Sequence, residues 1–166
     1  MSRQEILNVA MHKNLPLAKG GLIHSSKEFN PRLVSGNVAN YYYRTVLFEN
    51  LSEIILLISP EKSNYQQTLY EIEVRFIENE KNKGLFPYVL KVLEERYGQP
   101  KIENKIFLKN RIWRPDADSE VRLISNDLTI RIKYTDLKIK KFAEELSRST
   151  YELPKTPGEH KDAGKF

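Results

Sequence analysis

Alternation of apolar and polar residues is the clearest pattern in this chain. From Tyr70 to Phe76 every second residue is apolar, and the residues between them are two glutamates and an arginine. Residues 128–134 repeat the pattern, with Leu, Ile, Ile and Tyr on the apolar side. Because successive side chains of a strand point to opposite faces, both stretches predict strands with one buried face and one wet face. Such half-buried strands are typical of an antiparallel sheet.

Four further stretches favour strands because they are rich in aromatic and β-branched residues or alternate in the same way. They cover residues 40–48, 53–59, 106–113 and 120–124. Asn, Asp and Ser are frequent in tight turns. The clusters at residues 50–52 and 125–127 therefore predict two of the connections between these strands.

Apolar residues recur at helical spacing between Phe86 and Tyr97, which predicts the strongest helix of the chain. Pro87 fits its first turn, where a missing N–H costs nothing. Gly98 is expected to end the helix, because glycine tolerates the positive φ of a helix terminus. A short helix is also expected over residues 3–11, where Ile, Leu and Ala share one side.

The order of these elements predicts the fold class. A last helix over residues 136–149, capped by Thr135 or Asp136, completes the order β-β-β-α-β-β-β-α. We therefore expect an α+β protein whose antiparallel sheet of about six strands carries two helices on one face. Three regions are predicted: residues 1–38 as a short helix and irregular segment packed on the domain, 39–150 as the core domain, and 151–166 as a mobile tail.

Composition narrows the class of protein. The chain has 166 residues and no cysteine, which excludes disulfides and thiolate chemistry. No run approaches the roughly 20 apolar residues of a membrane-spanning helix, so no span is expected. The first residues lack the apolar segment of a signal peptide, which favours the cytoplasm. Export is the alternative if a leader has been removed.

Candidate catalytic chemistry is sparse, and no catalytic residue or cofactor is predicted. Asp116, Asp118 and Glu120 place carboxylates at alternate positions, a spacing that can wrap a hard cation. The turn glycine and the distant bidentate glutamate of a calcium loop are missing at the required offsets. A metal-assisted enzyme using these three residues is therefore the third functional hypothesis, and a solvated turn is the simpler interpretation.

A basic, partly aromatic sheet face carries the second hypothesis, nucleic-acid binding. The net charge of +5 favours anionic partners. Cations spaced along strands with an aromatic residue among them can follow a phosphate backbone and stack a base. The same cations could meet an acidic protein, or could simply pair with glutamates across strands and keep the sheet soluble. The residues of this predicted face are Lys109, Arg111, Trp113, Arg122, Arg131 and Lys133.

The preferred hypothesis is a non-enzymatic binding module that recognises a protein partner through a face or edge of its sheet. The run of tyrosines at residues 41–43 supports it, because exposed tyrosines are common at protein interfaces. Tyr41 and Tyr43 are the candidate contact residues of this surface. The sequence leaves homo-oligomerisation open.

Overall fold

The computed structural model describes residues 1–15, 17–20, 40–60, 66–77, 84–126 and 129–151. Their elements, in chain order, are α1 (Arg3–His12), β1 (Ala18–Gly20), β2 (Asn40–Leu47), β3 (Asn50–Ile58), β4 (Leu69–Ile77), α2 (Leu85–Tyr97), β5 (Lys101–Ile102), β6 (Lys109–Trp113), β7 (Ser119–Ser125), β8 (Thr129–Asp136) and α3 (Leu137–Tyr151). The tail predicted at the C-terminus lies, apart from Tyr151, outside the described residues.

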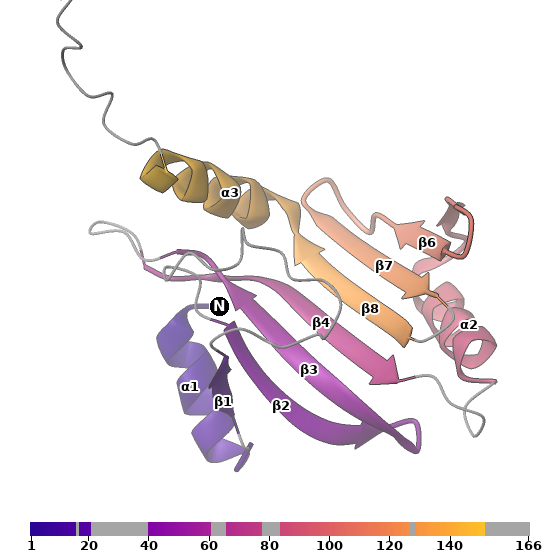
Figure 1. Cartoon of the computed structure of the whole chain (residues 1–166), viewed down its shortest axis with the longest axis horizontal. Helices are drawn as coiled ribbons and strands as arrows, with labels where there is room; N and C mark the ends of the chain where they lie inside the picture. Colours follow the sequence, from indigo (N-terminus) through magenta and orange to yellow (C-terminus); the bar gives the residue numbers. More distant parts are fainter. Residues whose placement is uncertain (16, 21–39, 61–65, 78–83, 127–128, 152–166) are drawn as a thin grey trace, which may run out of the picture.

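The described strands form one antiparallel sheet with the order β1-β2-β3-β4-β8-β7-β6-β5 (Figure 1). The sheet joins two meanders, β2-β3-β4 and β6-β7-β8, along the pairing of β4 with β8. This arrangement confirms the α+β class and the predicted order of elements. The sheet has two more strands than the six expected, β1 and β5, and their three and two residues are too short to show alternation.

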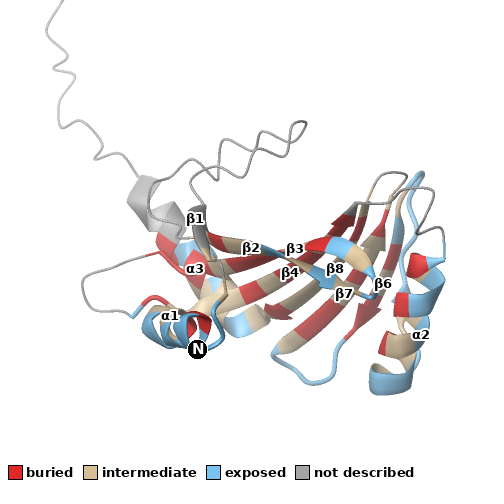
Figure 2. Cartoon of the chain, turned by 90° about the horizontal axis from the view of Figure 1, so that it is seen from below, coloured by how far each residue is buried: buried red, intermediate tan, exposed pale blue. Residues whose placement is uncertain are grey.

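The apolar sides of the central strands lie in register and form the core. Ile54, Val74, Ile132 and Leu123 stand next to one another on four adjacent strands, and all are buried. Ile6 of α1 and three residues of α2 complete the same cluster. Figure 2 shows α1 and α2 on the same side of the sheet, near its opposite ends. We call this side the apolar face and the other side the polar face.

Helix α2 agrees closely with its prediction. It ends at Tyr97, and Gly98 follows with φ +80° while its N–H donates to the carbonyl of Glu94. Only glycine adopts this backbone conformation without strain. The carbonyl of Gly98 in turn accepts a hydrogen bond of 2.7 Å from the indole Nε1 of Trp113. The end of α2 is therefore fastened to the sheet.

The second helix on the apolar face is α1, and not the last helix as the sequence suggested. The predicted cap of α3 is confirmed, since Asp136 Oδ1 accepts from the backbone N–H of Ile139 at 2.8 Å. The helix begins directly after β8, without a connecting loop. It reaches the beginning of β4, where Lys140 Nζ lies 3.3 Å from Glu71 Oε2, a carboxylate of the polar face.

The turn between β2 and β3 lies two residues earlier than predicted. Phe48 and Glu49 form it, with φ of 51° and 61°, while residues 50–52 belong to β3. Two consecutive positive φ values match the twist of a two-residue hairpin. Asn50 Nδ2 donates to the carbonyl of Phe48 at 2.6 Å, so the asparagine supports the turn from the first position of the strand.

The predicted connection between β7 and β8 is confirmed as far as the structure describes it. Ser125 pairs with Ile130 across the two strands. Asn126 Oδ1 accepts from both the backbone N–H and the hydroxyl of Thr129, at 2.8 and 2.9 Å. Residues 127–128 lie outside the described residues. Within the described part of the chain, no helix has both the length and the apolar character needed to cross a bilayer.

Candidate protein-binding edge

The structure divides the predicted basic face between the two sides of the sheet. Trp113 pairs with Val121 and Arg111 pairs with Leu123, so β6 turns these residues toward the apolar face. Ile106–Leu108 precede β6 and do not continue it, although the prediction extended the strand to Ile106. A strand that pairs in a different register turns its side chains to the opposite face of the sheet. The apolar face receives Lys109, Arg111 and Trp113, and the polar face receives Arg122, Arg131 and Lys133.

Trp113 belongs to the core. Its side chain packs in the same cluster as Val121, and the residue is 3% exposed. Lys109 at the edge of this face lies with Nζ 5.6 Å from the centre of the Phe86 ring, where the ammonium can interact with the aromatic face. The tryptophan is therefore not available to stack a nucleic-acid base.

The polar face carries a compact network of ion pairs. Lys133 Nζ lies 2.9 Å from Glu71 Oε1 and 3.0 Å from Glu73 Oε2. Arg75 adds a 2.9 Å contact to Glu73, and Lys140 adds its contact to Glu71. Both glutamates are buried. The sequence predicted that both glutamates would face water, whereas in the structure neither is accessible to solvent to any large extent.

Burial and the surrounding cations act on these carboxylates in opposite directions. Burial alone would raise the pKa of Glu71 and Glu73. Lys133 outweighs that effect at both sites, with Lys140 and Arg75 contributing, so that both pKa values lie below the usual 4.5. Burial lowers the pKa of Lys133, but the two glutamates raise it above 10.5. Glu71, Glu73 and Lys133 are therefore all charged at neutral pH.

The other two cations assigned to this face are placed differently. Arg122 pairs with Glu120, which also accepts from Arg114 at 3.3 Å. Arg131 stands beside Arg75 across the β4–β8 pairing, and its buried Nε has no hydrogen-bond partner. A phosphate backbone would have to compete with internal glutamates for two of the three cations predicted to bind it, Arg122 and Lys133.

The three carboxylates of the predicted metal site do not converge. Asp116 Oδ1 accepts from the backbone N–H of Asp118 at 2.9 Å, which is a turn contact. Both oxygens of Glu120 are taken up by Arg114 and Arg122. Throughout residues 1–151, outside the gaps given above, no group of three His, Asp or Glu residues is arranged to hold a metal. Asp116, Asp118 and Glu120 are therefore not arranged around a common point, and Arg114 and Arg122 already balance the charge of Glu120.

The tyrosines predicted as a contact surface lie on the apolar face. Tyr41 is buried, and its hydroxyl accepts a hydrogen bond of 2.8 Å from Arg3 Nε. Tyr43 is partly buried and packs against the core. Tyr42, between them, is the one on the polar face. Strand propensity explains the run, and Tyr41 offers no free surface.

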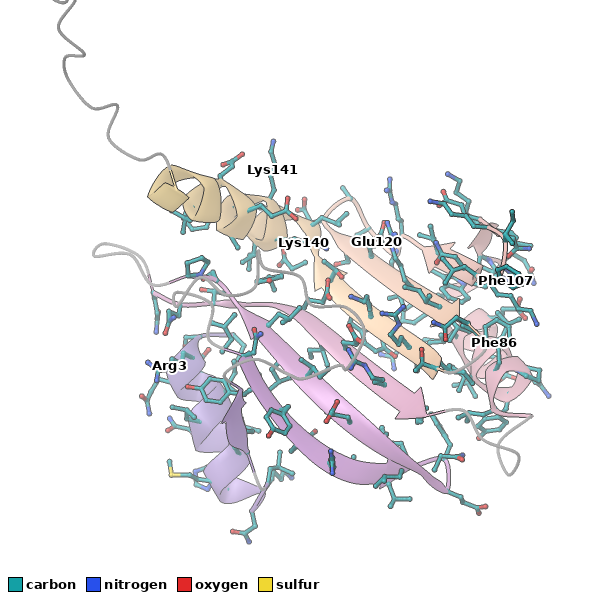
Figure 3. All side chains as sticks on the ribbon, in the orientation of Figure 1. Arg3, Phe86, Phe107, Glu120, Lys140 and Lys141 are labelled. Atoms are coloured by element: carbon teal, nitrogen blue, oxygen red, sulfur yellow. The ribbon has the colours of Figure 1, made fainter. Side chains whose placement is uncertain are left out.

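The two most exposed large apolar side chains of the described residues, Ile106 and Phe107, lie instead in the turn between β5 and β6, and Ile102 of β5 is also exposed. Ile106 is 85% exposed, Phe107 is 78% and Ile102 is 60%. Phe107 has φ +62° in the turn. In Figure 3 it lies at the end of the sheet next to α2, on which Phe86 is labelled, and at the opposite end from Arg3 of α1.

The backbone of this hairpin leaves one edge of the sheet unpaired by the described strands. Glu103 N donates to Asn110 O at 3.0 Å, and Lys105 N donates to Leu108 O at 3.0 Å. Backbone groups of successive strand residues point to opposite sides. The N–H and C=O of Ile102, which stands opposite Arg111, therefore point away from β6. They are free to pair with another strand.

Charged residues surround the exposed apolar ones. Lys101 Nζ lies 2.7 Å from Glu103 Oε1, and both side chains are exposed. Lys105 and Lys109 add two exposed cations on the same hairpin. An open hollow of about 480 Å³ beside the turn is lined by Asn104, Lys105, Phe107, Leu108, Lys109, Ser125 and Asn126. Apolar side chains inside a charged rim are the usual composition of a protein interface.

Sequence reasoning missed this edge because it placed Ile106 and its neighbours in a strand. One signal was present: Ile106, Phe107 and Leu108 are consecutive and do not alternate, and polar residues flank them on both sides. A strand that is buried on one side does not usually show such a run.

Comparison with known proteins adds no further evidence, since no protein-family description, no curated protein and no solved structure matches this chain.

Proposed function

We propose that this protein is a non-enzymatic binding module that recognises a protein partner through the edge of its sheet at the β5–β6 hairpin. The observation that carries the proposal is the exposure of Ile102 on the edge strand β5 and of Ile106 and Phe107 in the turn that follows it. Adjoining exposed apolar side chains inside a polar rim mark interaction sites, because single scattered ones are ordinary but clusters are costly. An extended segment of a partner can add to such an edge through its backbone.

Nucleic-acid binding has less support than it had from the sequence. Trp113 is buried, and two of the three cations on the polar face are paired with glutamates. The cations of the hairpin remain, and an aromatic residue stands among them. A test of the proposal should therefore also report on nucleic acid.

The test is co-purification from a native extract with the tagged full chain. Ile106→Ser combined with Phe107→Asn removes the apolar tip, and asparagine tolerates the positive φ at residue 107. The matched control is Val46→Ser with Leu51→Ser, a directly paired apolar couple at the β2–β3 end that is also exposed, 64% and 60%. We expect the hairpin variant to lose a stoichiometric protein partner and the control to keep it.

Two outcomes would contradict the proposal. Equal loss of the partner in both double variants would show that exposed apolar surface in general is responsible. Nuclease-sensitive co-purification, with retention on heparin that falls steeply with salt, would point to nucleic acid instead.

A further inference from the structure

We infer that the partner of the β5 edge is a second copy of this chain, paired antiparallel about a two-fold axis at Ile102. The inference rests on the proposed function, since it names the protein that this edge binds. Three features of the hairpin point to it: the free backbone groups, the order of charges along the strand, and the position of the exposed apolar residues.

The backbone groups fit a self-paired edge. The N–H and C=O of Ile102 point away from β6, as its pairing opposite Arg111 requires. When two such strands run antiparallel with Ile102 opposite Ile102, each copy donates its N–H to the carbonyl of the other. Pro100 has no N–H, so the ladder cannot extend far in that direction. The pairing is therefore short and uses the same edge of both copies, which closes a dimer and does not propagate.

The charges of the strand are complementary to themselves. Antiparallel pairing about Ile102 places Lys101 of each copy opposite Glu103 of the other. Lysine on an edge strand usually prevents pairing with other chains. Here the lysine would meet a carboxylate, and opposite charges directly across an antiparallel pair are favourable. In the single chain Lys101 and Glu103 pair with each other at 2.7 Å, but both side chains are well exposed, 74% and 44%, so each can exchange that partner for the opposite charge of the second copy.

The exposed apolar residues would be covered by the same event. The antiparallel direction carries residues 104–107 of one copy past residues 97–100 of the other. Ile102 meets its own counterpart at the axis, and Ile106 and Phe107 approach the end of α2, where Tyr97 and Pro100 are partly buried. A second copy therefore accounts for the backbone, the charges and the apolar side chains together. An acidic partner would match only the lysines and would oppose Glu103.

The test is the molar mass of the full chain by sedimentation and light scattering over a range of concentrations. We expect a concentration-dependent dimer. Lys101→Glu and Glu103→Lys should each weaken it about tenfold or more, because each places like charges opposite one another at two symmetric positions. The double swap, Lys101→Glu with Glu103→Lys, should restore the dimer, since the opposite charges again face each other.

The matched control is the swap Lys91→Glu with Glu95→Lys on α2, an exposed pair of the same residue types away from the edge. It should leave the dimer unchanged. A dimer that ignores the single swaps, or a double swap that fails to restore it while circular dichroism shows a folded protein, would overturn the inference. A chain that stays monomeric at all concentrations would also overturn it. The proposed function would survive that last result if the tip variant still loses a different co-purifying protein.

Discussion

The pairing of β4 with β8 and the hairpin of β5 with β6 use the same ingredients and reach opposite environments. Each is antiparallel, and each contains a lysine within 3.0 Å of a glutamate carboxylate. At the β4–β8 pairing, Glu73 is buried and shares Lys133 with Glu71. On the hairpin, Lys101 and Glu103 stand in solvent. An ion pair between central strands therefore stabilises the fold, whereas the same pair on an edge hairpin stays exposed and can contact a partner.

The largest difference in the free energy of unfolding between these regions is expected for two phenylalanines. Phe76 on β4 is 0% exposed, whereas Phe107 stands free on the hairpin. Phe76→Ala should lower the free energy of unfolding by about 3–5 kcal/mol, because it leaves a cavity in the core. Phe107→Ala should change it by less than about 0.5 kcal/mol. Urea unfolding of both variants checks the contrast, and comparable losses would mean that the hairpin tip is packed.

The two lysines give the next largest difference. Lys133→Met leaves two buried carboxylates with Lys140 and Arg75 as the remaining cations and the Thr135 hydroxyl as a further donor to Glu71. Removing one partner of a fully buried pair costs about 3–5 kcal/mol, and we expect about 2–3 kcal/mol here because those two cations remain. Lys101→Met removes an exposed partner and should leave the urea midpoint unchanged within error. If both variants lost a similar amount of unfolding free energy, the distinction between a buried and an exposed ion pair would be wrong.

Acid should lower the stability of the protein by protonating the carboxylates of the β4–β8 network, with a smaller effect than the loss of Lys133. The folded-state pKa values of Glu71 and Glu73 are lowered below 4.5, so the stabilisation is complete above that pH and is lost as the pH falls through the lowered values. Urea midpoints measured between about pH 7 and pH 3 should therefore fall at the acid end. Buried pairs are screened little, so the loss should persist in about 0.5 M salt. In Lys133→Met it should shrink, and an unchanged acid dependence there would argue against the network.

Most of the fold could be predicted because its signals are local. The alternation from Tyr70 to Phe76 and the helical spacing before Gly98 depend on neighbours a few residues apart. The turn at Phe48 and Glu49 was misplaced because neither residue is a typical turn former, and Asn50 supports the turn from inside a strand. The β5–β6 edge was missed because residues 106–108 were assigned to a strand. The predicted basic face was divided because Trp113 and Arg111 change face with the register of β6.

The sequence by itself determined the α+β class, the order of the elements, the half-buried central strands and the end of α2 at Gly98. Tertiary structure alone decided which face each cation occupies, which helix joins α2 on the apolar face, and where apolar side chains stay exposed. The physical reason is the separation along the chain of the residues that interact. Period and propensity act between residues close in the chain, whereas register, burial and charge pairing join residues such as Glu71 and Lys133 from strands far apart in it.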